Sequence, residues 1–219
     1  MRTPKILFFP MGLLVFALLA HPLHAQSLSK VYVAPTGYVL GVIFTANPAF
    51  PCDIYIKDTG NLVWIDIQLS HALLEVYADG YLQLIEAGPS VALSLADGRL
   101  QKIGDISLSY ENGRIHKIGG MPFYYDTGQL RGFGDLSIAY DDVRRIARLG
   151  KIPLSYANGR FRQIGGLHFD YDSNGLVQKI GGASFSYENG TLQKMSGTLA
   201  GVSVIVSSVM EFRKKFPRR

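Results

Sequence analysis

Apolar and polar residues alternate strictly in short segments that recur between residues 91 and 197. In the segment 106–110, Ile106, Leu108 and Tyr110 alternate with Ser107 and Ser109. A period of two is typical of a strand with one buried face. The same alternation returns in the segments 121–125, 136–140, 152–156, 167–171 and 183–187. Residues 91–197 are therefore predicted to contain a series of equivalent strands.

Tyrosines mark the register of this series, since each alternating segment ends in one. They follow one another at intervals of 15 or 16 residues, at Tyr110, Tyr125, Tyr140, Tyr156, Tyr171 and Tyr187. A fixed period indicates a repeat architecture. Dipeptides such as Asn112-Gly113 follow the tyrosines and tolerate the positive φ of a type I′ turn. Gly-Gly or Gly-Asp pairs at the other end of each unit also fit primed turns. Each unit therefore predicts one β-hairpin.

The second segment of each unit carries apolar residues three positions apart, such as Val177 and Ile180. A flat strand cannot place both of these side chains on one face. A β-bulge can, because it inserts one extra residue into the strand. We therefore predict a bulge at the intervening pair, for example at Gln101/Lys102 or at Gln178/Lys179.

The units lie within a longer β-rich chain. Residues 30–45 predict a hairpin around Pro35–Gly37, and residues 53–69 predict another with Thr59-Gly60 at its turn. Residues 71–85 predict two strands, with a short helix at 71–77 as the alternative. These patterns divide the chain into five segments: 1–25 (processing segment), 26–90 (irregular hairpins that cap the array), 91–197 (regular hairpin repeats), 198–212 (terminal strand) and 213–219 (basic tail).

The predicted fold class is all-β, an antiparallel meander of tandem hairpin repeats. One hairpin of fifteen residues buries too little apolar surface to offset its own ordering, so neighbouring units must share a core. We expect a curled or coiled sheet whose concave face is filled by the tyrosines and phenylalanines. Closure as a barrel or as a two-layer sandwich remains open at this point.

Residues 1–25 have the layout of a secretory signal peptide. Arg2 and Lys5 precede an apolar run over residues 6–20, and a small residue, Ala25, ends the segment. The apolar run is short for a membrane span. This layout predicts export to the periplasm, the cell surface or the medium, without a transmembrane span in residues 26–219. An uncleaved N-terminal anchor is the alternative. Cys52 is the single cysteine, so an internal disulfide is excluded, and we expect its thiol to be buried.

The basic charge is concentrated at the two ends of the chain. Of 22 basic residues, two lie in residues 1–25 and five in residues 213–219, which leaves 15 basic against 17 acidic residues in 26–212. Nucleic acid is therefore not a predicted partner. The tail 213–219 is interpreted either as a solvated terminus or as a contact for an anionic surface.

Two fragments, Tyr125-Asp126-Thr127-Gly128-Gln129-Leu130 and Tyr171-Asp172-Ser173-Asn174-Gly175-Leu176, resemble the YD (RHS-type) repeat over about residues 91–197. The resemblance implies stacked hairpins in an extracytoplasmic setting, and it implies no catalytic residue. The present period of 15 or 16 is shorter than is typical of that family, and Glu or Ala often replaces the Asp.

Candidate chemistry is sparse. The histidines His71, His116 and His168 show no metal-ligand spacing with Cys52 or with one another, and no cofactor is predicted. His168 and Asp170 share a strand face, where an exposed pair is the plainer interpretation. The serines show no nucleophile motif.

Two cationic features are the candidate binding sites. The first is a polar stripe beside the predicted bulges. Its members are Gln101, Lys102, His116, Lys117, Arg131, Arg162, Gln163, Gln178, Lys179, Gln193 and Lys194. The second is an irregular repeat at residues 140–156. Its basic residues are Arg144, Arg145, Arg148 and Lys151. For each, a solvated surface is the alternative to an anion site.

These observations predict a secreted or periplasmic, non-enzymatic β-repeat protein that serves as a structural or binding module of the cell envelope. The main alternative is a protein that binds carbohydrate or an acidic polymer, and an enzyme is a remote third. An envelope polysaccharide or another envelope protein is the expected partner.

Overall fold

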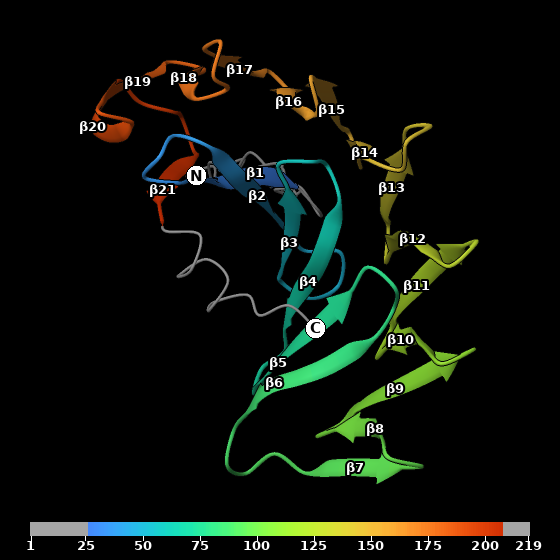
Figure 1. The fold of residues 1–219 in the computed structure, drawn as a ribbon. Helices are drawn as coiled ribbons and strands as arrows, with labels where there is room; N and C mark the ends of the chain where they lie inside the picture. The colour runs from blue at the N-terminus through green and yellow to red at the C-terminus, as the bar shows by residue number, and fades with distance from the viewer. Residues whose placement is uncertain (1–25, 208–219) are drawn as a thin grey trace, which may run out of the picture.

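The computed structural model describes residues 26–207, which form two β-sheets. The larger sheet has fourteen strands and runs as an open arc, and a seven-stranded sheet lies inside the arc (Figure 1). Neighbouring strands of the arc are consecutive in sequence and antiparallel, and the sheet does not close on itself. The predicted all-β meander of hairpin repeats is confirmed.

The arc consists of seven hairpins, each with a leading strand and a return strand. In order they are β7 (Leu93–Ala96) and β8 (Arg99–Ile103), β9 (Ile106–Glu111) and β10 (Arg114–Ile118), β11 (Met121–Asp126) and β12 (Gln129–Phe133), β13 (Leu136–Tyr140) and β14 (Ile146–Leu149), β15 (Ile152–Ala157) and β16 (Arg160–Ile164), β17 (Leu167–Tyr171) and β18 (Val177–Ile180), β19 (Ala183–Glu188) and β20 (Thr191–Ser196).

Every hairpin of the arc contains the predicted bulge. In the first hairpin Ser94 pairs with Lys102 and Leu95 pairs with Leu100, so Gln101 is the extra residue. The same shift recurs at the equivalent place in the other six hairpins. The turns also behave as the sequence indicates. Both residues have positive φ at Asp97-Gly98, Asn112-Gly113, Asn158-Gly159 and Asn189-Gly190, as a type I′ turn requires.

The inner sheet is built from the N-terminal hairpins and one C-terminal strand. Its strands are β1 (Ser27–Val33), β2 (Val39–Ala46), β3 (Cys52–Lys57), β4 (Leu62–Gln68), β5 (Ala72–Tyr77), β6 (Leu82–Ala87) and β21 (Ser203–Val206). β21 pairs in parallel with β1, and the other neighbours are antiparallel. The predicted hairpins at 30–45 and 53–69 are confirmed, and residues 71–77 form a strand rather than the alternative helix.

The main core lies between the two sheets. The inner sheet contributes fully buried side chains such as Phe44, Ile54 and Ile65, and the arc contributes others such as Ile115 and Phe161. We expected residues 26–90 to cap the array. They instead form a sheet that packs along the inside of the arc, because the apolar side of each hairpin needs a continuous apolar partner. The two sheets therefore form a wrapped two-layer sandwich.

Three turns of the inner sheet are fastened to the arc. The carbonyls of Gly37, Gly60 and Gly80 accept hydrogen bonds from the main-chain amides of Val177, Ile146 and Ile115, at 2.9 Å in each case. The three amides are each 31 residues apart, which is two repeat units. The turns thus contact every second hairpin.

The predicted signal peptide at 1–25 and the basic tail at 213–219 lie outside the described residues. Of the predicted terminal strand at 198–212, the described part contains β21.

Candidate functional site

The bulges fix which side chains point away from the core. In each hairpin the residue after the extra one lies on the outer face of the arc, beside a buried residue such as Ile103 or Ile118. Five of the seven hairpins carry a cation at this position. We call these side chains the outer cation row: Lys102, Lys117, Arg148, Lys179 and Lys194. All five are exposed.

The outer cation row has a regular spacing. Each hairpin contributes two strands, and neighbouring strands lie about 4.8 Å apart, so successive positions of the row are roughly 10 Å apart. Gly132 and Gln163 occupy the two remaining positions. A Cβ atom on Gly132 would lie 2.5 Å from the carbonyl oxygen of Leu136, so a lysine does not fit there without a shift of the main chain.

Small and hydroxyl-bearing residues flank the row. Lys102 lies opposite Ser94 and Ser107, and Lys179 lies opposite Asp170 and Ser184. Asp170 is the one acidic residue paired directly across from a member of the row within the described strands. None of the five cations forms an ion pair within residues 26–207. The row is therefore a line of positive charges next to hydrogen-bonding serines.

The predicted polar stripe divides into two sets. Lys102, Lys117, Lys179 and Lys194 belong to the outer cation row, with Gln163 in an equivalent place. The other six members are instead the extra residues of their bulges: Gln101, His116, Arg131, Arg162, Gln178 and Gln193. Arg131 is paired with Asp126 at 3.2 Å and lies over the ring of Tyr140 at 5.2 Å. This pairing leaves Arg131 less available to an external anion than the lysines of the row.

The irregular repeat does not gather its four cations. Arg144 is in the turn before β14 and Lys151 in the turn after it, so these two lie at opposite ends of the strand. Arg148 lies between them and belongs to the outer cation row. Sequence reasoning assigned Arg148 to the irregular repeat, and alignment of the bulge positions would have placed it in the row.

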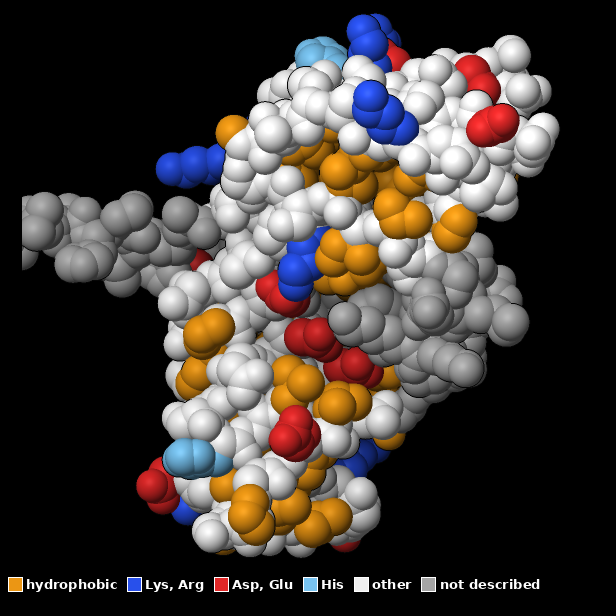
Figure 2. All heavy atoms as spheres, turned by 90° about the vertical axis from the view of Figure 1, so that its left-hand side faces the viewer, with side chains coloured by type: hydrophobic (Ala, Val, Ile, Leu, Met, Phe, Trp, Pro, Cys, Tyr) orange, Lys and Arg blue, Asp and Glu red, His pale blue; other side chains and the backbone are white. Residues whose placement is uncertain are grey.

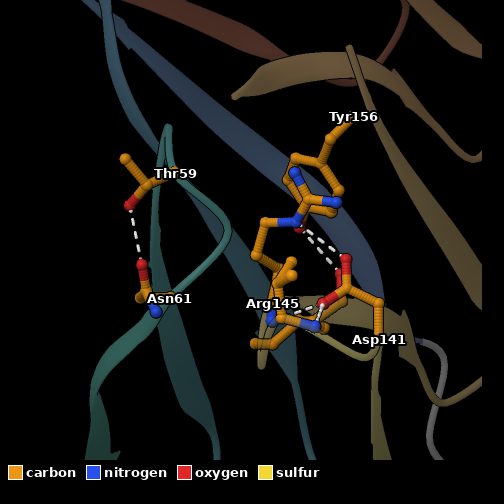
Figure 3. Close-up of polar contacts among 7 residues, drawn as sticks. Thr59, Asn61, Asp141, Arg145 and Tyr156 are labelled. Atoms are coloured by element: carbon orange, nitrogen blue, oxygen red, sulfur yellow. Dashed lines mark hydrogen bonds and ion pairs between the residues drawn. The ribbon is translucent and has the colours of Figure 1, made fainter. Parts of the chain in front are cut away.

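Arg145 has a structural contact on each side (Figure 3). Its Nε donates to Oδ2 of Asp141 at 2.7 Å, and its guanidinium lies 4.5 Å from the ring centre of Tyr156. Oδ1 of Asp141 accepts from the amides of Val143 and Arg145, which closes the turn. Asp172 holds the turn after β17 in the same way, through the amides of residues 174 and 176. In these two hairpins the aspartate that follows the repeat tyrosine is thus a turn residue.

The tyrosines that mark the repeats are partly buried and face the core. Four of their hydroxyls donate to a carbonyl ten residues earlier, from Tyr110, Tyr140, Tyr156 and Tyr187 to Leu100, Leu130, Ile146 and Val177, at 2.6–2.8 Å. Burial raises the pKa of Tyr140 to about 12 and raises the pKa of Tyr156 as well. These rings are fastened within the fold and do not form an exposed aromatic platform.

Sequence reasoning missed a second polar feature, on the face of the inner sheet that points away from the arc. Asp53, Asp66 and Glu75 lie directly opposite one another on β3, β4 and β5. Beside them Tyr55 and Trp64 stack with ring centres 4.5 Å apart. Figure 2 shows acidic side chains gathered on this side of the molecule.

Asp66 lies in a small pocket with Lys30, Asp53 and Trp64. Burial, followed by repulsion from Glu75 and Asp53, raises the pKa of the Asp66 carboxyl to about 7. The alternation of residues within β3, β4 and β5 could have indicated that these three carboxylates are on the same face of the sheet. Only the register between the strands places them opposite one another.

The remaining candidates are separate from one another. Nδ1 of His116 lies 3.4 Å from Oε2 of Glu111, and both residues line a pocket of about 420 Å³ between two hairpin turns. His168 is exposed and lies opposite Gln163. Cys52 is buried, and burial raises its thiol pKa to about 12. Between residues 26 and 207 no group of three or more His, Cys, Asp or Glu side chains is placed to hold a metal ion. The same residues contain no helix long and apolar enough to cross a membrane.

Comparisons with known proteins give no relative. No family model, no curated protein and no solved structure matches this chain. The resemblance to YD repeats therefore stays a prediction.

Proposed function

We propose that this protein is an exported, non-enzymatic binding module of the cell envelope whose outer face binds an extended acidic polymer. The observation that carries the proposal is the outer cation row. The repeat places the same type of charge at the same register position in five of seven hairpins, without an ion-pair partner within 4 Å among the described residues.

The spacing of the row favours a polymer over a small anion. Two neighbouring row positions are roughly 10 Å apart, so the row as a whole is far longer than one phosphate or carboxylate can contact. At that distance two like charges in water repel by only about 0.4 kcal/mol, so the row does little harm to the free protein. A chain of anions could contact several cations in succession, and the serines could hydrogen-bond to its hydroxyl groups.

The expected affinity is modest. Each exposed ion pair contributes up to about 1 kcal/mol, so five pairs give on the order of 3–5 kcal/mol. That range corresponds to a Kd near 1 mM for one segment of polymer. A long polymer with many such segments would bind more tightly through avidity. Binding should weaken with salt, because exposed charges are screened.

The inward tyrosines argue against the alternative of a neutral sugar. Such a ligand would be expected to stack on exposed aromatic rings, whereas four of the six repeat tyrosines donate hydrogen bonds to main-chain carbonyls. A mainly electrostatic mode of binding is the better match to the outer face.

The test uses residues 26–219 and three probes, namely polygalacturonate, dextran sulfate and uncharged dextran, each at low and high salt. We expect salt-sensitive binding to the two acidic polymers and none to dextran. A row variant carries Lys117→Ser, Lys179→Ser and Lys194→Ser. A control variant with the same net charge carries Lys57→Ser, Arg144→Ser and Lys151→Ser.

The row variant should bind roughly 10- to 100-fold more weakly, as the loss of three exposed pairs implies. The control variant should stay within about threefold of the parent, a change of roughly 0.6 kcal/mol. Equal losses in the two variants would contradict the proposal, because they would show a response to net charge alone. Deletion of residues 213–219 separates any contribution of the basic tail.

A further inference from the structure

The two ends of the arc are unlike and complementary. The arc begins with a leading strand, β7, and ends with a return strand, β20. Inside the arc a return strand pairs with the next leading strand six times, from β8 with β9 to β18 with β19. The exposed edge of β20 is therefore of the kind that β7 would extend.

Core positions that are buried inside the arc are exposed at its first strand. Leu93 of β7 is 42% exposed. Its equivalents in the other six leading strands are between 1% and 5% exposed: Leu108, Phe123, Ile138, Leu154, Phe169 and Phe185. The position is apolar in every hairpin, but in β7 no preceding hairpin covers it.

The last strand shows the same exposure. Met195 of β20 is 46% exposed. Its equivalents in the other six return strands are between 0% and 4% exposed: Ile103, Ile118, Phe133, Leu149, Ile164 and Ile180. Arrays of repeats usually carry a polar surface at their terminal units, which keeps them soluble. Here both terminal units keep the apolar residue of the internal ones.

Exposed apolar residues are concentrated at the end strands of the two sheets. Nine large hydrophobic side chains are exposed in the described part of the chain, and six of them lie on an end strand of a sheet or next to one. The six are Tyr81, Ile85, Leu93, Leu95, Met195 and Val206. In Figure 2 hydrophobic side chains gather at the lower end of the molecule, where Figure 1 places β7.

The edge of β7 lacks the usual protection. Exposed edge strands are commonly guarded by lysine, proline or inward-pointing charge, because they can pair with another chain. All four residues of β7, Leu-Ser-Leu-Ala, are exposed and uncharged. An edge of this kind is suited to strand addition.

We propose that copies of this chain associate head to tail, with β20 of one copy pairing in antiparallel fashion with the start of the first hairpin of the next, at Val91 and Ala92 immediately before β7. The register follows from the arc itself. Ile180 pairs with Ala183 and Lys179 with Ser184, so Met195 would lie opposite Val91 of the second copy and Lys194 opposite Ala92.

The occupant is a second copy because this chain supplies both halves of the junction. Met195 and Leu93 would become covered in the way that their equivalents are covered at the six internal junctions. The contact is heterologous, so it leaves a free β20 and a free β7 at the two ends of any open assembly, and further copies can add. This inference is independent of the proposed polymer binding.

Cross-linking between single-cysteine sites tests the register. Ala92→Cys and Lys194→Cys are made separately in residues 26–219. Both positions are exposed, with Lys194 in β20 and Ala92 immediately before β7. Cys52 is retained, because its buried thiol should not react. A short bis-maleimide should give covalent dimer when the two variants are mixed and much less with either variant alone. A mid-array variant, Ser155→Cys, should give none when mixed with Ala92→Cys.

Sedimentation velocity over a wide range of protein concentration supplies a second readout. The parent chain should show a series of oligomers, and Leu93→Lys should weaken association at least tenfold. Tyr124→Lys, at an exposed apolar site away from the ends, should leave association unchanged. A chain that stays monomeric at every concentration and forms no cross-link would overturn the proposal. So would efficient cross-linking of Ala92→Cys with itself, which would indicate a symmetric contact.

Discussion

The contact between the inner sheet and the arc can be tested at Gly60. This residue has φ of +85°, and its carbonyl accepts the amide of Ile146. A Cβ atom added here would lie 2.6–2.7 Å from ring atoms of Tyr156. That ring cannot move away freely, because its hydroxyl donates to Ile146 at 2.7 Å and Arg145 covers one of its faces.

The substitution Gly60→Ala therefore carries two costs. An alanine in the left-handed region costs roughly 1–2 kcal/mol, and the overpacking against a fixed ring costs about 1–3 kcal/mol more. Gly98→Ala is the matched control, since Gly98 has φ of +72° and open space around the added Cβ atom. We expect the control to lose only the first amount.

Urea unfolding of the two variants and the parent measures the difference, provided that the slope of the transition is unchanged. Gly60→Ala should be less stable than Gly98→Ala by about 1–3 kcal/mol. If the two variants are equally stable, the inner turn is not held against the arc as described, and the account of the core between the sheets fails.

Three further predictions concern single side chains. Tyr140→Phe should cost about 1 kcal/mol of stability, because it removes the hydroxyl that donates to Leu130, whereas Tyr124→Phe on the outer face should cost almost nothing in the same unfolding assay. Arg144→Gly should stabilise the protein by about 0.5–1 kcal/mol, because Arg144 has φ of +65°, and an unchanged or lower midpoint would contradict this reading of the turn. The pKa of Asp66 is raised from 3.8 to about 7, so between these pH values the folded state holds a proton that the unfolded state releases. The resulting contribution to stability is present below about pH 4 and is lost as the pH rises to about 7. Asp66→Asn should reduce this pH dependence of stability, and an unaltered pH profile would argue against a raised pKa.

Local pattern was sufficient to predict the hairpins that form the arc. The three-residue spacing of pairs such as Val177 and Ile180 predicted the bulges, and Asn-Gly dipeptides predicted the turns. Both features depend on residues within one hairpin, so they can be predicted from the sequence before the rest of the fold is known. The alternation in residues 71–77 was also present, and the strand that forms there shows that pairing with two neighbours outweighs helix formation in a short segment.

The position of the inner sheet could not be predicted in this way. Gly60 meets Tyr156, and these residues are far apart in sequence with no shared local motif. The opposition of Asp53, Asp66 and Glu75 likewise depends on the registers of three separate strands. The candidate cations were found from the repeat, but their division into the outer cation row and the bulge residues needed the pairing of each hairpin.

The binding of polygalacturonate by the row variant and by the charge-matched control decides whether the outer cation row recognises an acidic polymer. We expect salt-sensitive binding by the parent and the control, and a loss of roughly 10- to 100-fold when Lys117, Lys179 and Lys194 are replaced by serine. Binding by the row variant that equals binding by the control would contradict the account, because the outer cation row would then have no role in recognising an acidic polymer.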